Sequence, residues 1–267
     1  MIVRLFILLI FYSFSANATE VQERILANGL KVLVKEQHRS PVVVTQIWYK
    51  VGSSYEPSGI TGISHMLEHM MFKGTDKHPA GEFSKIISEN GGRENAFTGR
   101  DYTAYFQTLE KSRLAISFEL EADRMQHLHL LADELKKELQ VVMEERRMRT
   151  EDRPRAKLQE YLMAMAYVNS PYKNPVIGWP SDIESYQVED LQQWYQAWYA
   201  PNNATIVVAG DVQAEEVFKL AEQYFSAIPA RTIKRLKPQK EMPQVGVRRM
   251  TVQLPSEVPY LLMAYKV

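Results

Sequence analysis

Alternating hydrophobic and polar positions dominate the first part of the chain and predict β-strands. Residues 25–27 and 30–34 flank Asn28-Gly29, a dipeptide that favours the positive φ angles of a two-residue hairpin turn. Residues 42–51 predict a third strand, because they are rich in β-branched and aromatic side chains. Further strands are predicted over residues 93–98, 102–109 and 204–209.

Hydrophobic residues at helical spacing predict the helices. In residues 62–73 the isoleucine, leucine and methionine side chains fall on one helix face, and Gly74 follows at the position of a C-terminal cap. Further helices are predicted over residues 82–89, 111–130, 133–150, 156–168, 188–199 and 214–227. Helices mixed with antiparallel hairpins predict an α+β fold, in which a mixed, mainly antiparallel sheet packs against helices.

The composition changes near the C-terminus. Residues 229–245 carry prolines and basic residues with little hydrophobic periodicity, which is typical of an exposed linker. Beyond it, residues 248–254 and 260–267 predict two strands with no helix beside them, and two strands alone do not make a stable sheet. We therefore interpret residues 19–228 as a first domain and residues 246–267 as the start of a second domain, which is truncated.

The N-terminus has the pattern of a secretory signal peptide. Arg4 precedes a largely apolar run over residues 5–14, and Ala16-Asn17-Ala18 provides the small residues of a cleavage site. An uncleaved anchor is the alternative, but a helix that spans a bilayer needs roughly 20 apolar residues. We expect residues 1–18 to be removed and the chain to be exported to a periplasm, or otherwise secreted, without a stable membrane anchor.

The composition removes support from several classes of function. Lys and Arg together number 32, as do Asp and Glu, so no net charge would recruit nucleic acid or a membrane surface. The chain has no cysteine, which excludes disulfides, thiolate metal ligands and a cysteine nucleophile. Neither a Gly-x-Ser-x-Gly motif nor a phosphate-binding glycine loop is present, so a serine hydrolase or a nucleotide enzyme has no support.

The segment His65-Met66-Leu67-Glu68-His69 carries the strongest functional signal. Its two histidines are four residues apart on a predicted helix, so both imidazoles project from one face and can bind one zinc ion. Glu68 lies on that face and can take a proton from a zinc-bound water as general base. The order is the inverted form of a familiar zinc-peptidase motif. An exposed helix with an incidental pair is the alternative, but burying unpartnered imidazoles and a carboxylate in so apolar a helix would be costly.

A zinc ion needs a third protein ligand that leaves one position for water. Glu138 and Glu145 are two helical turns apart and share one face of a predicted helix, whereas Glu144 points elsewhere. Lysine and arginine residues surround these acids, so the pattern alone favours a solvated, charged face.

The other histidines and an aromatic cluster carry weaker signals. His127 and His129 are two residues apart on a predicted helix, so they face different directions and are expected at the solvated surface. His38 and His78 fall in predicted loops without a pattern of partners. Four aromatic residues are predicted to belong to the core: Trp194, Tyr195, Trp198 and Tyr199.

Residues 65–75 closely resemble the signature of the pitrilysin/insulinase family of zinc peptidases, the inverzincins, especially the branch that contains the mitochondrial processing peptidase. The resemblance does not rest on this motif alone. Four later segments resemble further landmarks of the family, in the family's order, and extend the resemblance over about residues 24–267: residues 91–105, 138–145, 171–178 and 199–212.

The resemblance implies a zinc endopeptidase with one Zn²⁺ per chain. It implies His65, His69 and Glu145 as the zinc ligands and Glu68 as the general base that acts on a zinc-bound water. Glu138 would be an auxiliary catalytic acid that orients a histidine or tunes the water. The edge that a substrate peptide joins as an added strand would consist of Asn95, Ala96, Phe97 and Thr98.

The resemblance also implies partners. In this family two homologous halves close around a peptide or an unfolded polypeptide, and the second half donates groups that steady the oxyanion. That half would lie in the same longer chain or in another subunit, so this chain is expected to bind zinc but to hydrolyse peptides poorly. A non-catalytic scaffold or partner subunit of the same fold is the alternative, although such relatives usually lose motif residues and all four are present here.

Overall fold

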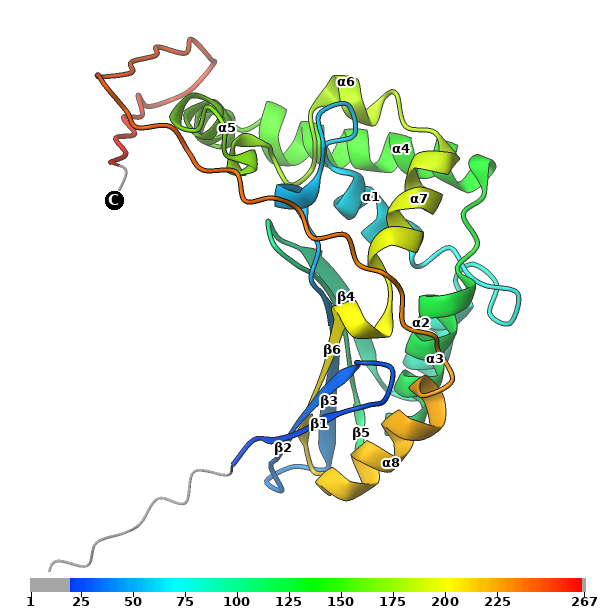
Figure 1. The fold of residues 1–267 in the computed structure, drawn as a ribbon. Coiled ribbons are helices and arrows are strands. Elements are labelled where there is room, and N and C mark those ends of the chain that lie inside the picture. The colour runs from blue at the N-terminus through cyan, green and yellow to red at the C-terminus, as the bar shows by residue number, and fades with distance from the viewer. Residues whose placement is uncertain (1–19, 266–267) are drawn as a thin grey trace, which may run out of the picture.

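The structure is a computed structural model that describes residues 20–265, and its strands form one six-stranded sheet (Figure 1). The strands are β1 (Gln22–Ile25), β2 (Lys31–Glu36), β3 (Val42–Tyr49), β4 (Arg93–Thr98), β5 (Thr103–Glu110) and β6 (Ala204–Gly210). Their order across the sheet is β1-β2-β6-β3-β5-β4, which leaves β1 and β4 at the two edges.

The sheet is mixed and mainly antiparallel, which confirms the predicted α+β fold. Strand β3 pairs antiparallel with both β5 and β6, and β2 pairs parallel with β6. The β1–β2 hairpin forms where Asn28-Gly29 predicted a turn, but the connection covers residues 26–30 and is longer than expected. Gly29 has the positive φ of 88° that the prediction requires, and the Asn28 amide reaches out to the carbonyl of Phe225 at 2.7 Å.

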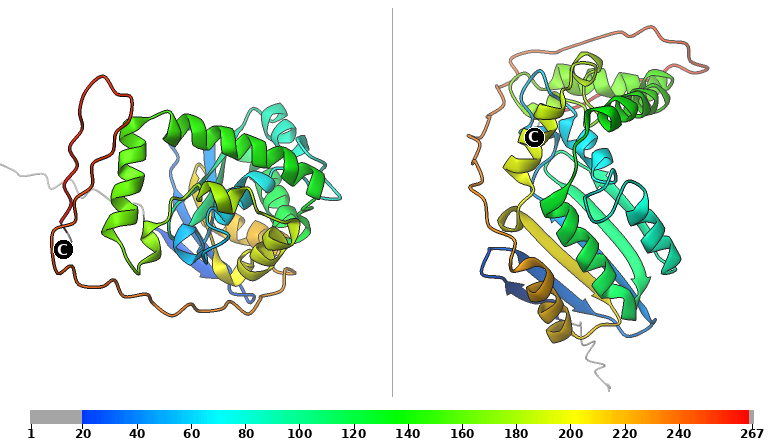
Figure 2. Two further views of the ribbon diagram at one scale, coloured as in Figure 1. Left: turned by 90° about the horizontal axis from the view of Figure 1, so that it is seen from above. Right: turned by 90° about the vertical axis from the view of Figure 1, so that its right-hand side faces the viewer.

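The described residues form eight α-helices, which divide into two groups. Helices α2, α3 and α8 lie against one face of the sheet, whereas the other five gather beyond one end of it (Figures 1 and 2). The helices are α1 (Ile63–Met70), α2 (Glu82–Glu89), α3 (Leu114–His127), α4 (Ala132–Arg146), α5 (Pro154–Ala166), α6 (Pro180–Ile183), α7 (Val188–Trp198) and α8 (Ala214–Phe225).

Most helix boundaries agree with the predictions within a few residues. Helix α4 ends earlier than predicted because the chain continues as a π-helical turn over Arg147–Glu151. The single-turn helix α6 was not predicted, because one turn is too short to show hydrophobic periodicity.

The core between the sheet and the helices includes a buried ion pair. Arg124 and Glu121 on α3 are both buried, and Arg124 Nε donates a hydrogen bond to Glu121 Oε2 at 2.8 Å. The guanidinium carbon of Arg124 lies 4.3 Å from the ring centres of both Phe83 and Tyr105. The aromatic cluster at residues 194–199 is buried as well, which confirms that it belongs to the core.

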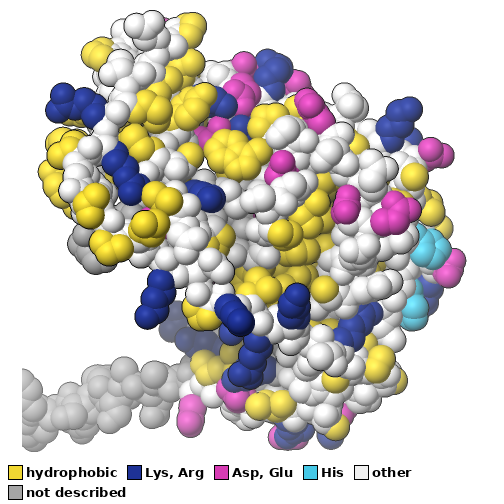
Figure 3. Space-filling view, turned by 45° about the horizontal axis from the view of Figure 1, so that its top comes forward, with side chains coloured by type: hydrophobic (Ala, Val, Ile, Leu, Met, Phe, Trp, Pro, Cys, Tyr) yellow, Lys and Arg dark blue, Asp and Glu magenta, His cyan; other side chains and the backbone are white. Residues whose placement is uncertain are grey.

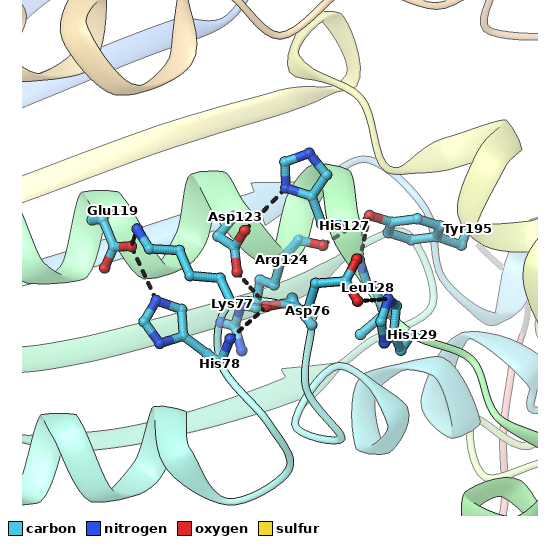
Figure 4. A network of polar contacts seen from close by, with 11 residues as sticks. Asp76, Lys77, His78, Glu119, Asp123, Arg124, His127, Leu128, His129 and Tyr195 are labelled. Atoms are coloured by element: carbon cyan, nitrogen blue, oxygen red, sulfur yellow. Dashed lines mark hydrogen bonds and ion pairs between the residues drawn. The ribbon is translucent and has the colours of Figure 1, made fainter.

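Polar contacts hold the loop between α1 and α2 against α3 and against the connection that follows α3 (Figure 4). His78 Nε2 lies 3.0 Å from Glu119 Oε1 on α3, and Asp76 Oδ1 lies 3.2 Å from His129 Nε2. His127 is at the surface, as expected, and pairs with Asp123 on its own helix.

The two histidines for which the sequence showed no pattern of partners, His38 and His78, both have a partner in the structure. His78 pairs with Glu119 as described, and His38 Nδ1 lies 2.7 Å from Asp211 Oδ1. Each partner is distant in the sequence, so only the fold brings it close.

The C-terminal segment corrects one prediction. The described residues from 229 to 265 contain no strand, so the strands predicted over residues 248–254 and 260–267 are wrong as far as the structure describes them. A strand needs a neighbour for its backbone hydrogen bonds, and the described part of this segment pairs with no strand of the sheet. Most of its apolar side chains remain exposed, and Figure 3 shows apolar side chains at the surface at upper left, where the segment lies.

Two side chains nevertheless attach this segment to the end of α5. Glu241 Oε2 accepts the backbone N–H groups of Asn169 at 3.0 Å and Ser170 at 2.8 Å. Arg248 Nη1 donates to the carbonyl of Met165 at 2.7 Å, near the C-terminus of the helix. The segment is therefore extended but anchored.

The interpretation of residues 1–18 as a signal peptide lies outside the described residues. Within residues 20–265, no helix is both long enough and apolar enough to cross a membrane.

Candidate metal centre

Helix α1, which carries the histidine motif, is fixed at its N-terminus by buried contacts. Its N-cap is Gly62, with a φ of 89° that disfavours any side chain, and a Cβ there would lie 2.4 Å from the carbonyl oxygen of Ile177. Glu56 supplies the acceptors that the cap lacks. Its carboxylate accepts the N–H of Gly62 at 2.6 Å and the N–H of Ser64 at 2.9 Å. When Glu56 is ionised, its negative charge also interacts favourably with the N-terminal end of the helix dipole.

The three predicted ligands converge, although they come from two helices. Glu145 Oε2 on α4 lies 3.6 Å from His65 Nε2 and 3.3 Å from His69 Nε2, both on α1. Their ligand atoms all lie within 4.8 Å of one another, and no other group of three such residues in the described part of the chain does so. A tetrahedral ion with bonds of about 2.0–2.1 Å separates its ligand atoms by about 3.4 Å, so this donor set fits zinc.

Burial and charge set the protonation of the three groups. Burial, together with the nearby His69, lowers the pKa of His65 to about 4, so this imidazole is neutral, as a metal ligand must be. Burial would also lower the pKa of His69, but hydrogen bonds to Glu138 and Glu145 outweigh it and raise that pKa to about 9. Burial raises the pKa of Glu145, and the hydrogen bond to His69 and the charge of His65 more than offset this, so that its pKa is lowered.

Glu138 lies behind His69, on the side away from Glu145. Its Oε1 is 2.9 Å from His69 Nδ1, and its other oxygen pairs with Lys73. The hydrogen bond with His69 lowers the pKa of Glu138 to about 2, with a further contribution from Lys73, so the carboxylate is charged. A carboxylate on Nδ1 fixes the imidazole ring with Nε2 directed at the metal position. The neighbouring Glu144 is exposed and pairs with Arg147, outside this cluster.

Glu68 is half-buried and connects α1 to the edge of the sheet. Its Oε2 accepts a hydrogen bond from Thr98 Oγ1, at the end of β4, at 2.5 Å. Burial raises the pKa of Glu68, although the Thr98 hydrogen bond lowers it. A carboxylate with a raised pKa beside a metal centre can both accept a proton and release it.

These side chains line one cleft with a volume of about 1050 Å³. Its walls include the predicted ligands, Glu68, Glu138 and all four residues Asn95, Ala96, Phe97 and Thr98. Strand β4, which contains those four, pairs only with β5 and leaves its other side unpaired within the sheet. The structure therefore brings every predicted site residue into one place.

Comparison with known proteins gives the family. Residues 31–179, more than half of the chain, match the sequence model of insulinase, peptidase family M16. Residues 185–267 match the model described as the M16 inactive domain. The chain belongs to peptidase family M16.

The M16 relatives are proteases that are longer than this chain. The zinc protease PqqE of Helicobacter pylori is 38% identical over 91% of this chain and 55% of its own length. The crystal structure of a protease from Helicobacter pylori matches with a TM-score of 0.80 at 38% identity, over 84% of this chain and 54% of that chain. The crystal structure of the periplasmic protease PqqL from Escherichia coli matches with a TM-score of 0.76 at 25% identity, over 82% of this chain and 25% of the PqqL chain. This chain spans about half the length of PqqE.

Several residues of the candidate site are not identified by the sequence patterns. Arg149 Nη1 lies 2.6 Å from Glu145 Oε1, and its position four residues after Glu145 on a helix is a signal that could have found it. The contacts of Glu56 with α1 and of Thr98 with Glu68 give no such signal, because a single sequence does not show which distant residues meet.

Proposed function

We propose that this chain is the metal-binding and catalytic half of a zinc endopeptidase, which hydrolyses a peptide bound as an added strand beside β4. The observation that carries the proposal is the convergence of His65, His69 and Glu145 in the same cleft as Glu68 and an unpaired strand edge. The name of PqqE, a zinc protease, supports it.

In this proposal His65, His69 and Glu145 hold one Zn²⁺ per chain. Bound there, zinc would polarise the scissile carbonyl and lower the pKa of a coordinated water towards about 7. Glu138 holds the His69 ring through Nδ1, so that Nε2 is presented to the ion. Both histidines lie on the largely buried helix α1, whose packing preorganises the ligands before the ion arrives.

Glu68 is the general base. Its carboxylate takes the proton of the attacking water and delivers it to the leaving amine, so one residue serves as base and then as acid. The hydrogen bond from Thr98 holds one carboxylate oxygen in place and leaves the other to exchange the proton. Positioning by a strand residue also ties the base to the edge along which the peptide lies.

Strand β4 supplies the binding surface for the substrate. An unpaired strand edge presents backbone N–H and C=O groups that pair with an extended peptide, which gives affinity with little demand on side chains. Asn95, Ala96, Phe97 and Thr98 would form this ladder, and Thr98 would place it beside Glu68. The substrates are peptides or unfolded polypeptides, because a folded segment cannot add a strand to the edge.

The proposal extends to the domains of the chain, its partner half and its location. We propose residues 19–228 as the zinc-binding domain, residues 229–245 as a linker and residues 246–267 as the start of a second homologous domain. A second half, in the same longer chain or in another subunit, would close the cleft and steady the oxyanion, so the chain alone would hydrolyse peptides poorly. We also propose removal of residues 1–18 and a periplasmic location, in keeping with PqqL, which is a periplasmic protease.

A comparison of Glu68→Gln with the unchanged protein tests the proposal in the assembly with the second half present. The variant should keep one zinc per chain and lose peptide hydrolysis by at least about 100-fold, as removal of a general base does. Glu144→Gln is the matched control, because that carboxylate is exposed and outside the cleft. This variant should keep both its zinc and its peptide hydrolysis. A non-catalytic scaffold, the alternative, would show neither bound zinc nor any activity to lose.

A further inference from the structure

Two basic side chains of the cleft, Arg100 and Lys173, form no ion pair with a carboxylate among the described residues. Both line the cleft of the metal centre, and both are half-buried. Arg100 Nε donates to the carbonyl of Tyr172 at 3.4 Å, and its guanidinium carbon lies 5.6 Å from the Tyr172 ring centre. Lys173 Nζ donates to the carbonyl of Val168 at 3.1 Å. These neutral partners hold the two cations in place but leave their charges uncompensated.

The acidic residue next to Arg100 on the same hairpin, Asp101, has hydrogen-bond partners other than Arg100. Asp101 accepts a hydrogen bond from Ser54 Oγ at 2.6 Å and another from the Tyr172 hydroxyl. It does not line the cleft. The charge of Arg100 is therefore available to a bound molecule.

Each of the other Lys, Arg and Glu side chains that line the cleft has an ion-pair partner, except Glu68, which accepts a hydrogen bond from Thr98. Lys73 pairs with Glu138, and Arg149 pairs with Glu145. Glu160 pairs with the buried Arg146, 2.8 Å away. Four basic and four acidic residues line the cleft, so a bound divalent cation would leave it with a positive balance. A substrate that fills it would be favoured by negative charge.

Arg100 lies at one end of the substrate edge, and Lys173 follows Tyr172, whose carbonyl accepts a hydrogen bond from Arg100. Arg100 is in the turn between β4 and β5. In this turn the Gly99 N–H donates a hydrogen bond to the carbonyl of Tyr102 at 2.7 Å. Thr98, at the start of this turn, contacts Glu68. At a strand rise of about 3.3 Å per residue, a peptide side chain at this end lies within about three residues of the bond that Glu68 serves.

We propose that Arg100 and Lys173 form a specificity site that selects peptides with an Asp or Glu side chain within three residues of the scissile bond, on the Thr98 side. The inference rests on the proposed peptidase function and adds the class of substrate. A carboxylate there would gain charge-assisted hydrogen bonds from a guanidinium and an ammonium that are half removed from water, where ion pairs are stronger than on an open surface. A lysine at the same peptide position would be repelled.

The test uses the zinc-loaded chain with Glu68→Gln, so that bound peptides stay intact. Fluorescent peptides of one sequence carry Glu, Gln or Lys at each of three positions on either side of the central bond, and their affinities are measured by anisotropy. We expect Glu on one side to bind about five- to tenfold more tightly than Gln, and Lys to bind more weakly than Gln, an order that higher salt reduces.

Adding Arg100→Gln and Lys173→Gln should abolish this order while zinc content stays at one per chain, which also verifies folding. Arg155→Gln, an exposed basic residue that does not line the cleft, is the matched control and should leave the preference unchanged. Equal affinity for Glu, Gln and Lys peptides at every position, or a preference that survives the double variant, would overturn the specificity site and leave the peptidase proposal standing. A zinc-loaded chain that binds none of the peptides would count against the added-strand mode itself, and the specificity site would fall with it.

Discussion

Glu56 gives a direct test of how the start of the metal-binding helix is held. Its side chain is only 5% exposed, and burial raises its pKa to about 7, although the hydrogen bonds from Gly62 and Ser64 lower it. In the unfolded chain the pKa of such a group is 4.5. Between these two values the folded chain binds a proton that the unfolded chain has released.

The sign and size of the effect follow from the two pKa values. The folded-state pKa is the higher one, so the contribution of Glu56 to stability is full below about pH 4.5 and is lost as the pH rises through about pH 7. At 1.36 kcal/mol per pKa unit, the loss is about 3 kcal/mol. Glu56→Gln removes the titration. Its amide still accepts one of the two N–H groups, and the cost of the other does not vary with pH.

Urea unfolding of both proteins at several pH values across this window, with a metal chelator present, measures the difference in free energy of unfolding. Other titrating groups cancel in that difference. The wild-type chain should lose about 3 kcal/mol relative to Glu56→Gln as the pH rises from about 4.5 to about 7. Glu184→Gln, an exposed carboxylate, is the control and should show no such trend. A difference for Glu56→Gln that stays constant with pH would refute the reasoning.

Three further changes test other parts of the account. Glu138→Gln should weaken zinc binding by about 10–100-fold, because the His69 ring loses its charged partner, and competition with a chromophoric chelator measures the affinity. The control, Glu144→Gln, should leave the zinc affinity unchanged. Equal zinc affinities for the Glu138→Gln variant and the wild type would show that Glu138 does not support the site. Arg124→Met should destabilise the chain by about 3–5 kcal/mol in urea, because the buried Glu121 carboxylate loses its cationic partner, and adding Glu121→Leu should recover much of the loss. Glu241→Gln should speed tryptic cleavage between residues 231 and 240 several-fold, since that carboxylate anchors the segment to α5; an unchanged rate would show that the anchor does not restrain it.

Local patterns were enough to predict most of the fold. The strand at residues 93–98 and the helix at residues 82–89 match the structure at both ends, because alternation and helical spacing are properties of neighbouring residues. The strands predicted beyond residue 248 failed for the opposite reason: a strand exists only with a partner, and the partner is not specified by the strand's own sequence.

The candidate site likewise contains residues that local spacing could group and residues that it could not. His65, Glu68 and His69 stand on one helix turn and could be grouped from spacing alone. Glu145 could not, because the lysines and arginines around it favour a solvated face and only the family resemblance linked it to the histidines. The contacts of Thr98 and Glu56 with this helix depend on how the sheet edge and a loop pack against α1, which no local pattern encodes.

The central claim is that His65, His69 and Glu145 together bind one zinc ion, and the zinc content of the protein tests it most directly. Elemental analysis measures this content in the purified chain and in Glu145→Gln after dialysis against a weak chelator. The two imidazoles and the remote carboxylate should together hold one zinc per chain, and replacing the carboxylate should release it while the circular dichroism spectrum stays unchanged. A chain that retains no zinc, or a Glu145→Gln variant that retains as much as the wild type, would contradict the account.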